Sequence, residues 1–287
     1  MQVDFMQNSF FSSNRFRLFT AGIASMALAC GGGEQSVPVE PVEVVEAAAP
    51  AALTAEMRAG ATQDHLVPSP GEMQAALTGA GIETSLGALV SRRALDMSAT
   101  NRDKVAVRTG VILADLLLTV KTATLDDTVS RFGQLREGLV VLQTGSDLPR
   151  EIDDLIERIS NGALMGDHLV FELDQLRAAV IPELEYEADW VLPMIQAGAW
   201  LEGANLVAQA IKEGEPGVGN ELLRQPDVVD YFLQYVQSEG DGRAADVVLM
   251  TLTATLESLK AICSKDSLDP SDIDTIQTST QSVLELL

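Results

Sequence analysis

Cysteine and histidine are scarce in this chain, and their scarcity excludes several kinds of site. The 287 residues include two of each. His168 and Glu172 stand one helical turn apart and could offer two metal ligands, but no second His/Glu pair completes a site. His65 lies in the segment before the first expected helix. No Gly-x-Ser-x-Gly turn and no glycine-rich loop after a strand is present, so neither a hydrolase triad, a metal site nor a cofactor is predicted.

Basic residues are also few: 19 Lys and Arg stand against 42 Asp and Glu, which gives a net charge of −23. A surface this negative repels phosphate backbones and acidic lipid headgroups. The composition therefore argues against nucleic acid binding and against membrane docking through basic patches. Solubility explains the acidity most simply, and a dedicated basic partner is the alternative.

No apolar run reaches the length of a membrane span, but a shorter run has the order of a lipoprotein signal peptide. Residues 15–30 read RFRLFTAGIASMALAC: a basic start, an apolar segment from Leu18 to Leu28, and small residues before Cys30. We therefore expect the chain to be exported, cut before Cys30 and held to a membrane by acyl groups on that cysteine. Ala27-Leu28-Ala29 also fits ordinary secretory cleavage at the same bond, which stays the alternative.

The residues after Cys30 favour the lipidated interpretation. Gly31-Gly32-Gly33-Glu34 and the following SVPVEPVEVVEAAAPAA have no helical period and are typical of a disordered tether. Gly31 is not the Asp that, by resemblance to enteric lipoproteins, retains such proteins at the inner membrane, so the periplasmic face of the outer membrane is expected. The predicted organisation is a signal peptide (1–29), a lipidated cysteine with an acidic Pro/Ala/Val tether (30–64) and a helical domain (65–287).

Beyond the tether, apolar residues recur at intervals of three and four almost throughout, and strand signals are absent. Ser69-Pro70-Gly71-Glu72 predicts a capped helix start. Pro182 is expected to interrupt one helix and Pro193 to kink the next. Cys263, in an apolar helical pattern, is expected to be a buried thiol. Helices are predicted over about 69–78, 101–122, 125–142, 152–159, 165–180, 188–212, 226–236, 249–259 and 269–287, with residues 82–98 ambiguous.

These elements predict an all-α fold: a single domain of eight or nine antiparallel helices, either a compact bundle or a short stack of helical hairpins. No fixed-period consensus of the tetratricopeptide kind is present. The sequence GEPGVG at 214–219 is interpreted as a turn between two helices.

Three motifs resemble, in order and spacing, an uncharacterised family of exported, often lipid-anchored helical proteins of Gram-negative bacteria. They are Val67-Pro68-Ser69-Pro70 with Glu72-Met73 and Gly81, Gly110-Val111 with Ala114-Asp115-Leu116, and Gly198-Ala199-Trp200-Leu201-Glu202-Gly203. The similarity spans about Val67 to Lys212. Leu118 replaces an expected aromatic residue and Ala199 an expected glycine. The resemblance implies fold and location and names no reaction.

Four residues are candidates for an internal polar site: Asp115, Arg108, Glu202 and Trp200. Asp115 has apolar neighbours in sequence and is expected to meet solvent or a cation from another helix, because buried carboxylates are usually paired. Glu202 aligns with Asn205, Gln209 and Glu213, as at the start of an exposed face. Trp200 points the opposite way, towards the core or an interface.

Two functions remain open at this stage. One is a lipid-anchored interaction or scaffold module that binds a protein partner, with contact to the membrane through the N-terminal lipid. The other is a ligand-binding or enzymatic bundle in which Asp115 and Glu202 converge on a cavity, with His168 as a further candidate. The second would require those side chains to share one space, so their placement in the fold discriminates between the two.

Overall fold

The computed structural model describes residues 66–93, 95–187, 190–239 and 247–287. The predicted signal peptide, Cys30, the tether and His65 lie outside these residues. Everything described is helix, turn or irregular connection, so the all-α prediction is confirmed. Nine helices of ten or more residues occur in the described part of the chain, with a short α3 and one 3₁₀ turn besides. None of these helices is both long and apolar enough to cross a bilayer.

The first helix, α2 (Pro70–Gly79), begins as the sequence predicts. The Ser69 hydroxyl accepts a hydrogen bond from the Glu72 amide, and the Glu72 carboxylate accepts one from the Ser69 amide at 2.7 Å. This reciprocal cap satisfies amides that have no partner inside the helix. Asp269 and Asp272 form the same arrangement at the start of α11 (Pro270–Glu285). Helix α9 (Pro226–Glu239) also begins at its proline, as predicted.

Two central helices, α4 (Arg102–Thr119) and α8 (Leu192–Glu213), make the most extensive contact of the fold. They cross where each carries a glycine. A Cβ on Gly110 would lie closer than 3.0 Å to the backbone carbonyl of Ile195, and one on Gly198 would meet the carbonyl of Val107 in the same way. Only glycine allows the two backbones to approach so closely. Both glycines belong to the motifs singled out in the sequence.

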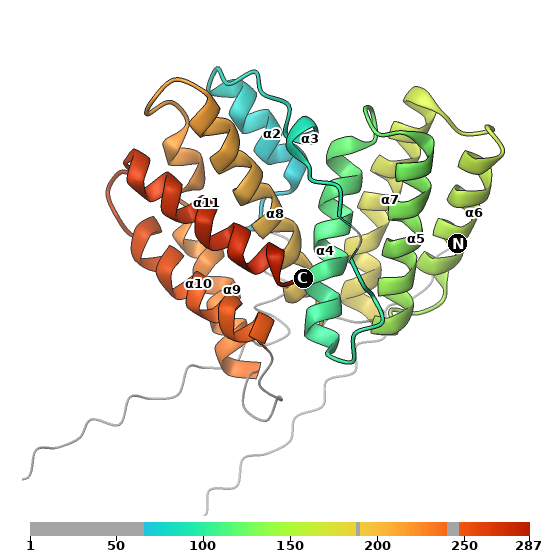
Figure 1. The fold of residues 1–287 in the computed structure, drawn as a ribbon. Coiled ribbons are helices and arrows are strands. Elements are labelled where there is room, and N and C mark those ends of the chain that lie inside the picture. The colour runs from blue at the N-terminus through green and yellow to red at the C-terminus, as the bar shows by residue number, and fades with distance from the viewer. Residues whose placement is uncertain (1–65, 94, 188–189, 240–246) are drawn as a thin grey trace, which may run out of the picture. The chain divides into compact units, whose positions relative to one another are not determined.

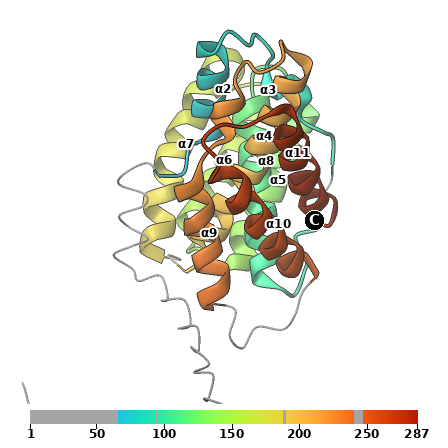
Figure 2. The same cartoon turned by 90° about the vertical axis from the view of Figure 1, so that its left-hand side faces the viewer.

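The other helices flank this pair (Figure 1). On the α4 side lie α5 (Leu125–Leu142), α6 (Asp147–Ser160) and α7 (Gly166–Glu187), and on the α8 side lie α11, α10 (Val247–Cys263) and α9. The view of Figure 2 shows α9, α10 and α11 gathered in front of the central pair. In a sequential stack of hairpins, α8 would pack next to α7 at the end of the row. Here α8 packs mainly against α4, so the order of the helices in space differs from their order in the chain.

Two proline predictions are wrong. Helix α7 continues through Pro182 to Glu187, and the buried side chains of Val180 and Leu184 on either side of the proline explain why. The free energy gained by burying these side chains offsets the cost of the backbone hydrogen bond that the proline removes. Helix α8 is not kinked at Pro193, because the helix begins at Leu192 and the proline occupies its first turn, where a missing N–H costs nothing.

Residues 82–98, which the sequence leaves ambiguous, contain the short α3 (Leu86–Leu89) and an irregular connector, residues 90–93 and 95–101, that runs to the N-cap of α4. After α8, the GEPGVG segment is a turn, as predicted, and it leads into the 3₁₀ turn η1 (Asn220–Leu223). The thiol of Cys263 is buried, as expected, and donates to the Leu223 carbonyl at 3.3 Å.

Candidate functional site

Asp115 and Glu202 meet at the contact between α4 and α8. Each carboxyl is only 1% exposed. Both side chains come from helices that are apolar on nearly every side, so the pair lies inside the core. The expectation that Glu202 begins an exposed face is wrong, and so is the expectation that Asp115 could meet solvent. Glu213, at the end of the same helix, is exposed as the pattern suggests.

The cation that compensates this pair is Arg93, which comes from the connector between α3 and α4. One terminal nitrogen, Nη2, forms an ion pair with Oε1 of Glu202 and lies 3.8 Å from Oδ1 of Asp115. The Arg93 side chain is 19% exposed, so it covers the carboxyls from the solvent side. An irregular segment thus supplies the positive charge that two buried acids on regular helices require.

Burial and mutual repulsion keep a proton in the pair. Loss of hydration raises the pKa of Asp115 to about 8, and the neighbouring Glu202 charge adds to this rise, while Arg93 and Arg131 oppose it. Burial also raises the pKa of Glu202. The close contact of the two carboxyls raises the pKa of Asp115 further and opposes the rise in the pKa of Glu202. Arg93 lies beside both carboxyls and opposes the rise in the pKa of each.

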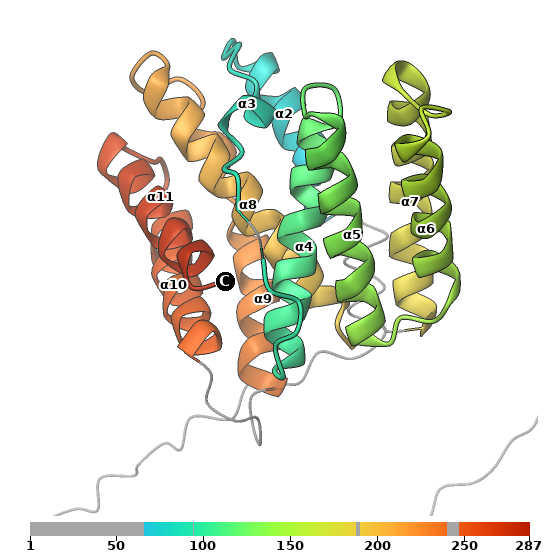
Figure 3. The ribbon, with the colours of Figure 1, turned by 45° about the vertical axis from the view of Figure 1, so that its right-hand side comes forward.

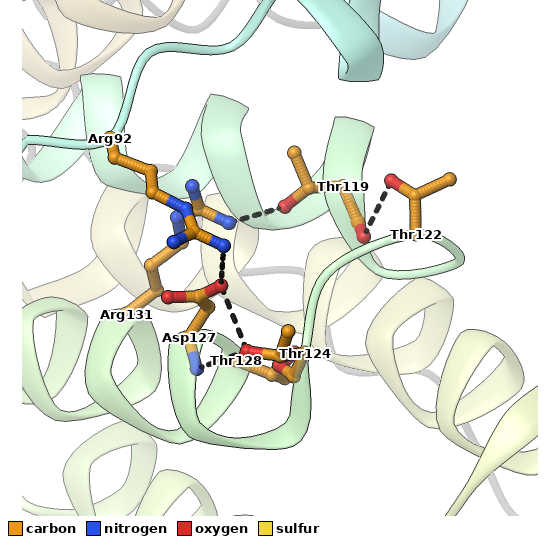
Figure 4. Close-up of polar contacts among 7 residues, drawn as sticks. All are labelled: Arg92, Thr119, Thr122, Thr124, Asp127, Thr128 and Arg131. Carbon is orange, nitrogen blue, oxygen red and sulfur yellow. Dashed lines mark hydrogen bonds and ion pairs between the residues drawn. The ribbon is translucent and has the colours of Figure 1, made fainter.

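Arg131 of α5 is the second cation of this region. Its Nη1 donates to the hydroxyl of Thr119 at 2.8 Å (Figure 4). That hydroxyl donates in turn to the backbone carbonyl of Asp115 at 2.6 Å. The next connector residue, Arg92, pairs with Asp127 of α5 at 3.0 Å, also drawn in Figure 4. The connector is therefore attached to α5 by one arginine and to the α4–α8 core by the next.

Arg108 and Trp200, the other two candidates, make contacts of a different kind. The Arg108 guanidinium donates to the backbone carbonyls of Asp96 and Leu287. Trp200 is buried, as expected: its indole N–H donates to Gln225 at 2.8 Å, and its ring packs on Phe232 with centroids 5.8 Å apart. Of the four candidates, the structure thus brings only Asp115 and Glu202 together. Their partner is Arg93, which the sequence did not indicate.

His168 does not join the pair. It is exposed on α7, and Glu172, one turn away, forms an ion pair with Arg158 of α6 at 2.7 Å. Among the residues that the structure describes, no group of three or more His, Cys, Asp or Glu side chains is placed to hold a metal ion.

Asp115 and Glu202 line none of three grooves on the described surface. One lies between α6 and α7, one beside α2 and η1, and one beside the turns that precede α5 and α7, with volumes of about 770, 280 and 380 Å³. The two buried carboxyls instead connect α4 and α8 to the connector through Arg93.

No protein-family model matches the chain, and neither a curated protein nor a solved structure is similar to it.

Proposed function

We propose that this chain is an exported, lipid-anchored helical protein that binds a protein partner beside the membrane. One structural observation favours binding over catalysis: the buried acids that could serve as catalytic groups are paired with Arg93 and line none of the three surface grooves described above. The resemblance to exported helical proteins is part of the same proposal and stays a prediction.

The anchor half of the proposal rests on the sequence. A basic start, an apolar run too short to span and Cys30 after small residues are what lipoprotein export requires. A tether of about 30 residues would have a coil span on the order of 30 Å. The domain could then search a thin layer beside the bilayer, where a membrane partner is held at a high effective concentration.

Site-specific photo-cross-linking in cells that export the full chain tests this function. A photoreactive residue would replace Phe171 on α7 or Met250 on α10, two side chains that are more than 60% exposed. We expect a discrete adduct from at least one position in the wild-type background. The adduct should weaken several-fold in Cys30→Ser, because the untethered protein loses its effective concentration.

A photoreactive residue at Glu215, in the turn after α8, serves as the exposed control position. Equal, diffuse labelling from all three positions would contradict the proposal. So would an exported protein that acts on a small molecule and yields no adduct.

A ligand-binding bundle is the second candidate, and one observation favours it. Three buried polar atoms have no hydrogen-bond partner within the described residues: Nε of Arg93, Oδ1 of Asp115 and Oε2 of Glu202. A small polar molecule could satisfy such atoms. A compound that raises the Tm of the wild-type protein but not that of Glu202→Gln would favour this candidate over the interaction module.

A further inference from the structure

The largest of the three grooves, the α6–α7 groove, follows two helices at one edge of the described fold (Figure 3). Its lining residues recur at helical spacing. They are Asp147, Arg150, Glu151, Asp154, Leu155 and Arg158 from α6, with Glu172, Gln175, Leu176 and Ala179 from α7. From Asp147 to Arg158 the groove runs along about 16 Å of helix at 1.5 Å per residue. Its elongated form suits a chain segment better than a compact molecule.

The groove also has apolar side chains along it. Leu155 and Leu176 are almost fully buried and fill the space below it, and Ala179, which is exposed, adds a small apolar side chain on α7. The ring of Phe171 is 62% exposed one turn before Gln175, so an aromatic side chain lies on the same face of α7. Aromatic and aliphatic anchors that become buried dominate the binding energy of protein interfaces, and the exposed Phe171 ring beside this groove is a side chain that a partner could bury.

The rim of the groove is negative. Four carboxylates and two guanidinium groups line it. Both arginines are already engaged: Arg150 pairs with Asp147, and Arg158 pairs with Asp154 at 3.3 Å and with Glu172 at 2.7 Å. Glu151 has no ion-pair partner in the part of the chain that the structure describes. A cationic partner would therefore gain attraction here, and an acidic one would be repelled.

We infer that the α6–α7 groove binds a basic amphipathic segment of a partner protein, with the apolar side chains of that segment on Phe171 and Ala179 and its Lys or Arg residues against the acidic rim. A helix-in-groove contact of this kind combines a continuous apolar strip with flanking charge. The inference rests on the proposed interaction function and names the surface and the partner chemistry through which it would act.

The test uses the full chain in detergent with synthetic peptides. The probe is a helical peptide of about 14 residues, long enough to cover the groove, with leucine at every third and fourth position and lysine elsewhere. A scrambled peptide of the same composition has the same charge but no apolar face. Glu151→Lys reverses the charge at one position of the rim, and Glu257→Lys makes the same charge change on the exposed surface of α10, outside the groove.

We expect the amphipathic peptide to bind the wild type more tightly than the scrambled peptide does, as measured by fluorescence anisotropy. Glu151→Lys should raise its Kd by about five- to tenfold, because it replaces an attraction by a repulsion at a partly screened site. Glu257→Lys should change the Kd less than about twofold. Unchanged urea midpoints for both variants would show that each of them folds.

Other outcomes overturn the inference. Equal binding of both peptides, or equal loss in both variants, would mean diffuse attraction to an acidic protein. Displacement of the peptide by an equimolar polyamine such as spermine would indicate a small-cation site. If the peptide does not bind but a cross-linked partner is found through Met250, the groove inference fails while the proposed function stands. If neither result is obtained, both fail.

Discussion

Replacing Gly198 by alanine should destabilise the protein by about 3 kcal/mol, although alanine is normally the better helix former. The added Cβ would overlap the Val107 carbonyl of α4, and the same change at Gly110 would overlap the Ile195 carbonyl of α8. Backbone atoms at a helix crossing cannot rotate away as a flexible side chain can, so the two central helices must separate. Urea unfolding of each variant measures the loss.

Gly133→Ala in α5 is the matched control, because a Cβ there would meet nothing within 4 Å. That variant should be more stable than the wild type by about 0.5–1 kcal/mol. The double variant Gly110→Ala/Gly198→Ala should lose less stability than the sum of the two single losses, because a helix separation that accommodates one methyl group also accommodates the other. If Gly198→Ala behaved like Gly133→Ala, the close approach of α4 and α8 would be wrong.

The second large effect concerns Arg93. Arg93→Gln should cost about 3–5 kcal/mol at pH 9, because it leaves two buried carboxyls without their cation. At pH 5 the cost should be clearly smaller, because the pair then holds a proton and carries less charge to compensate. Urea unfolding between pH 4 and pH 9 measures both. Arg92→Gln is the matched control: its side chain is 79% exposed, and its loss should change stability by less than about 1 kcal/mol.

The pH dependence has a definite sign. The pKa of Asp115 is raised from its ordinary value of 3.8 to about 8, so the folded state holds a proton that the unfolded state has released. The contribution of this proton to the free energy of unfolding is fully present below about pH 4 and is lost as the pH rises through about 8. Asp115→Asn should remove much of this decline in the free energy of unfolding. A wild-type stability that rose steadily from pH 5 to pH 8, with no difference in Asp115→Asn, would contradict the shared proton.

The local features of the fold were predictable from sequence because they depend on neighbouring residues. The caps at Ser69 and Asp269 need only side chains three residues apart, and most helix periods stand out against polar faces. The prolines at 182 and 193 show the limit of such reasoning. A proline inside a helical pattern has several outcomes, and the burial of residues around it decides among them.

The candidate site was predictable only in part. Asp115 stands out as an acid among apolar residues, but its cation could be any of 19 Lys and Arg. Arg93 lies in a connector with no periodic pattern, so nothing in the sequence places it beside α8. The same connector explains why Glu202 was misjudged: its helical spacing suggests an exposed face, and Arg93, attached to a distant segment of sequence, covers the Glu202 carboxylate.

Acyl labelling of Cys30 tests the central claim most directly. Cells exporting the full chain would be fed an alkyne-bearing fatty acid, and the wild type would be compared with Cys30→Ser, with Cys263→Ser as the matched control for the other cysteine. We expect the wild type and Cys263→Ser to carry the labelled fatty acid and to associate with the membrane, and Cys30→Ser to do neither. A mature wild-type protein that carried no fatty acid and remained in the soluble fraction would contradict it.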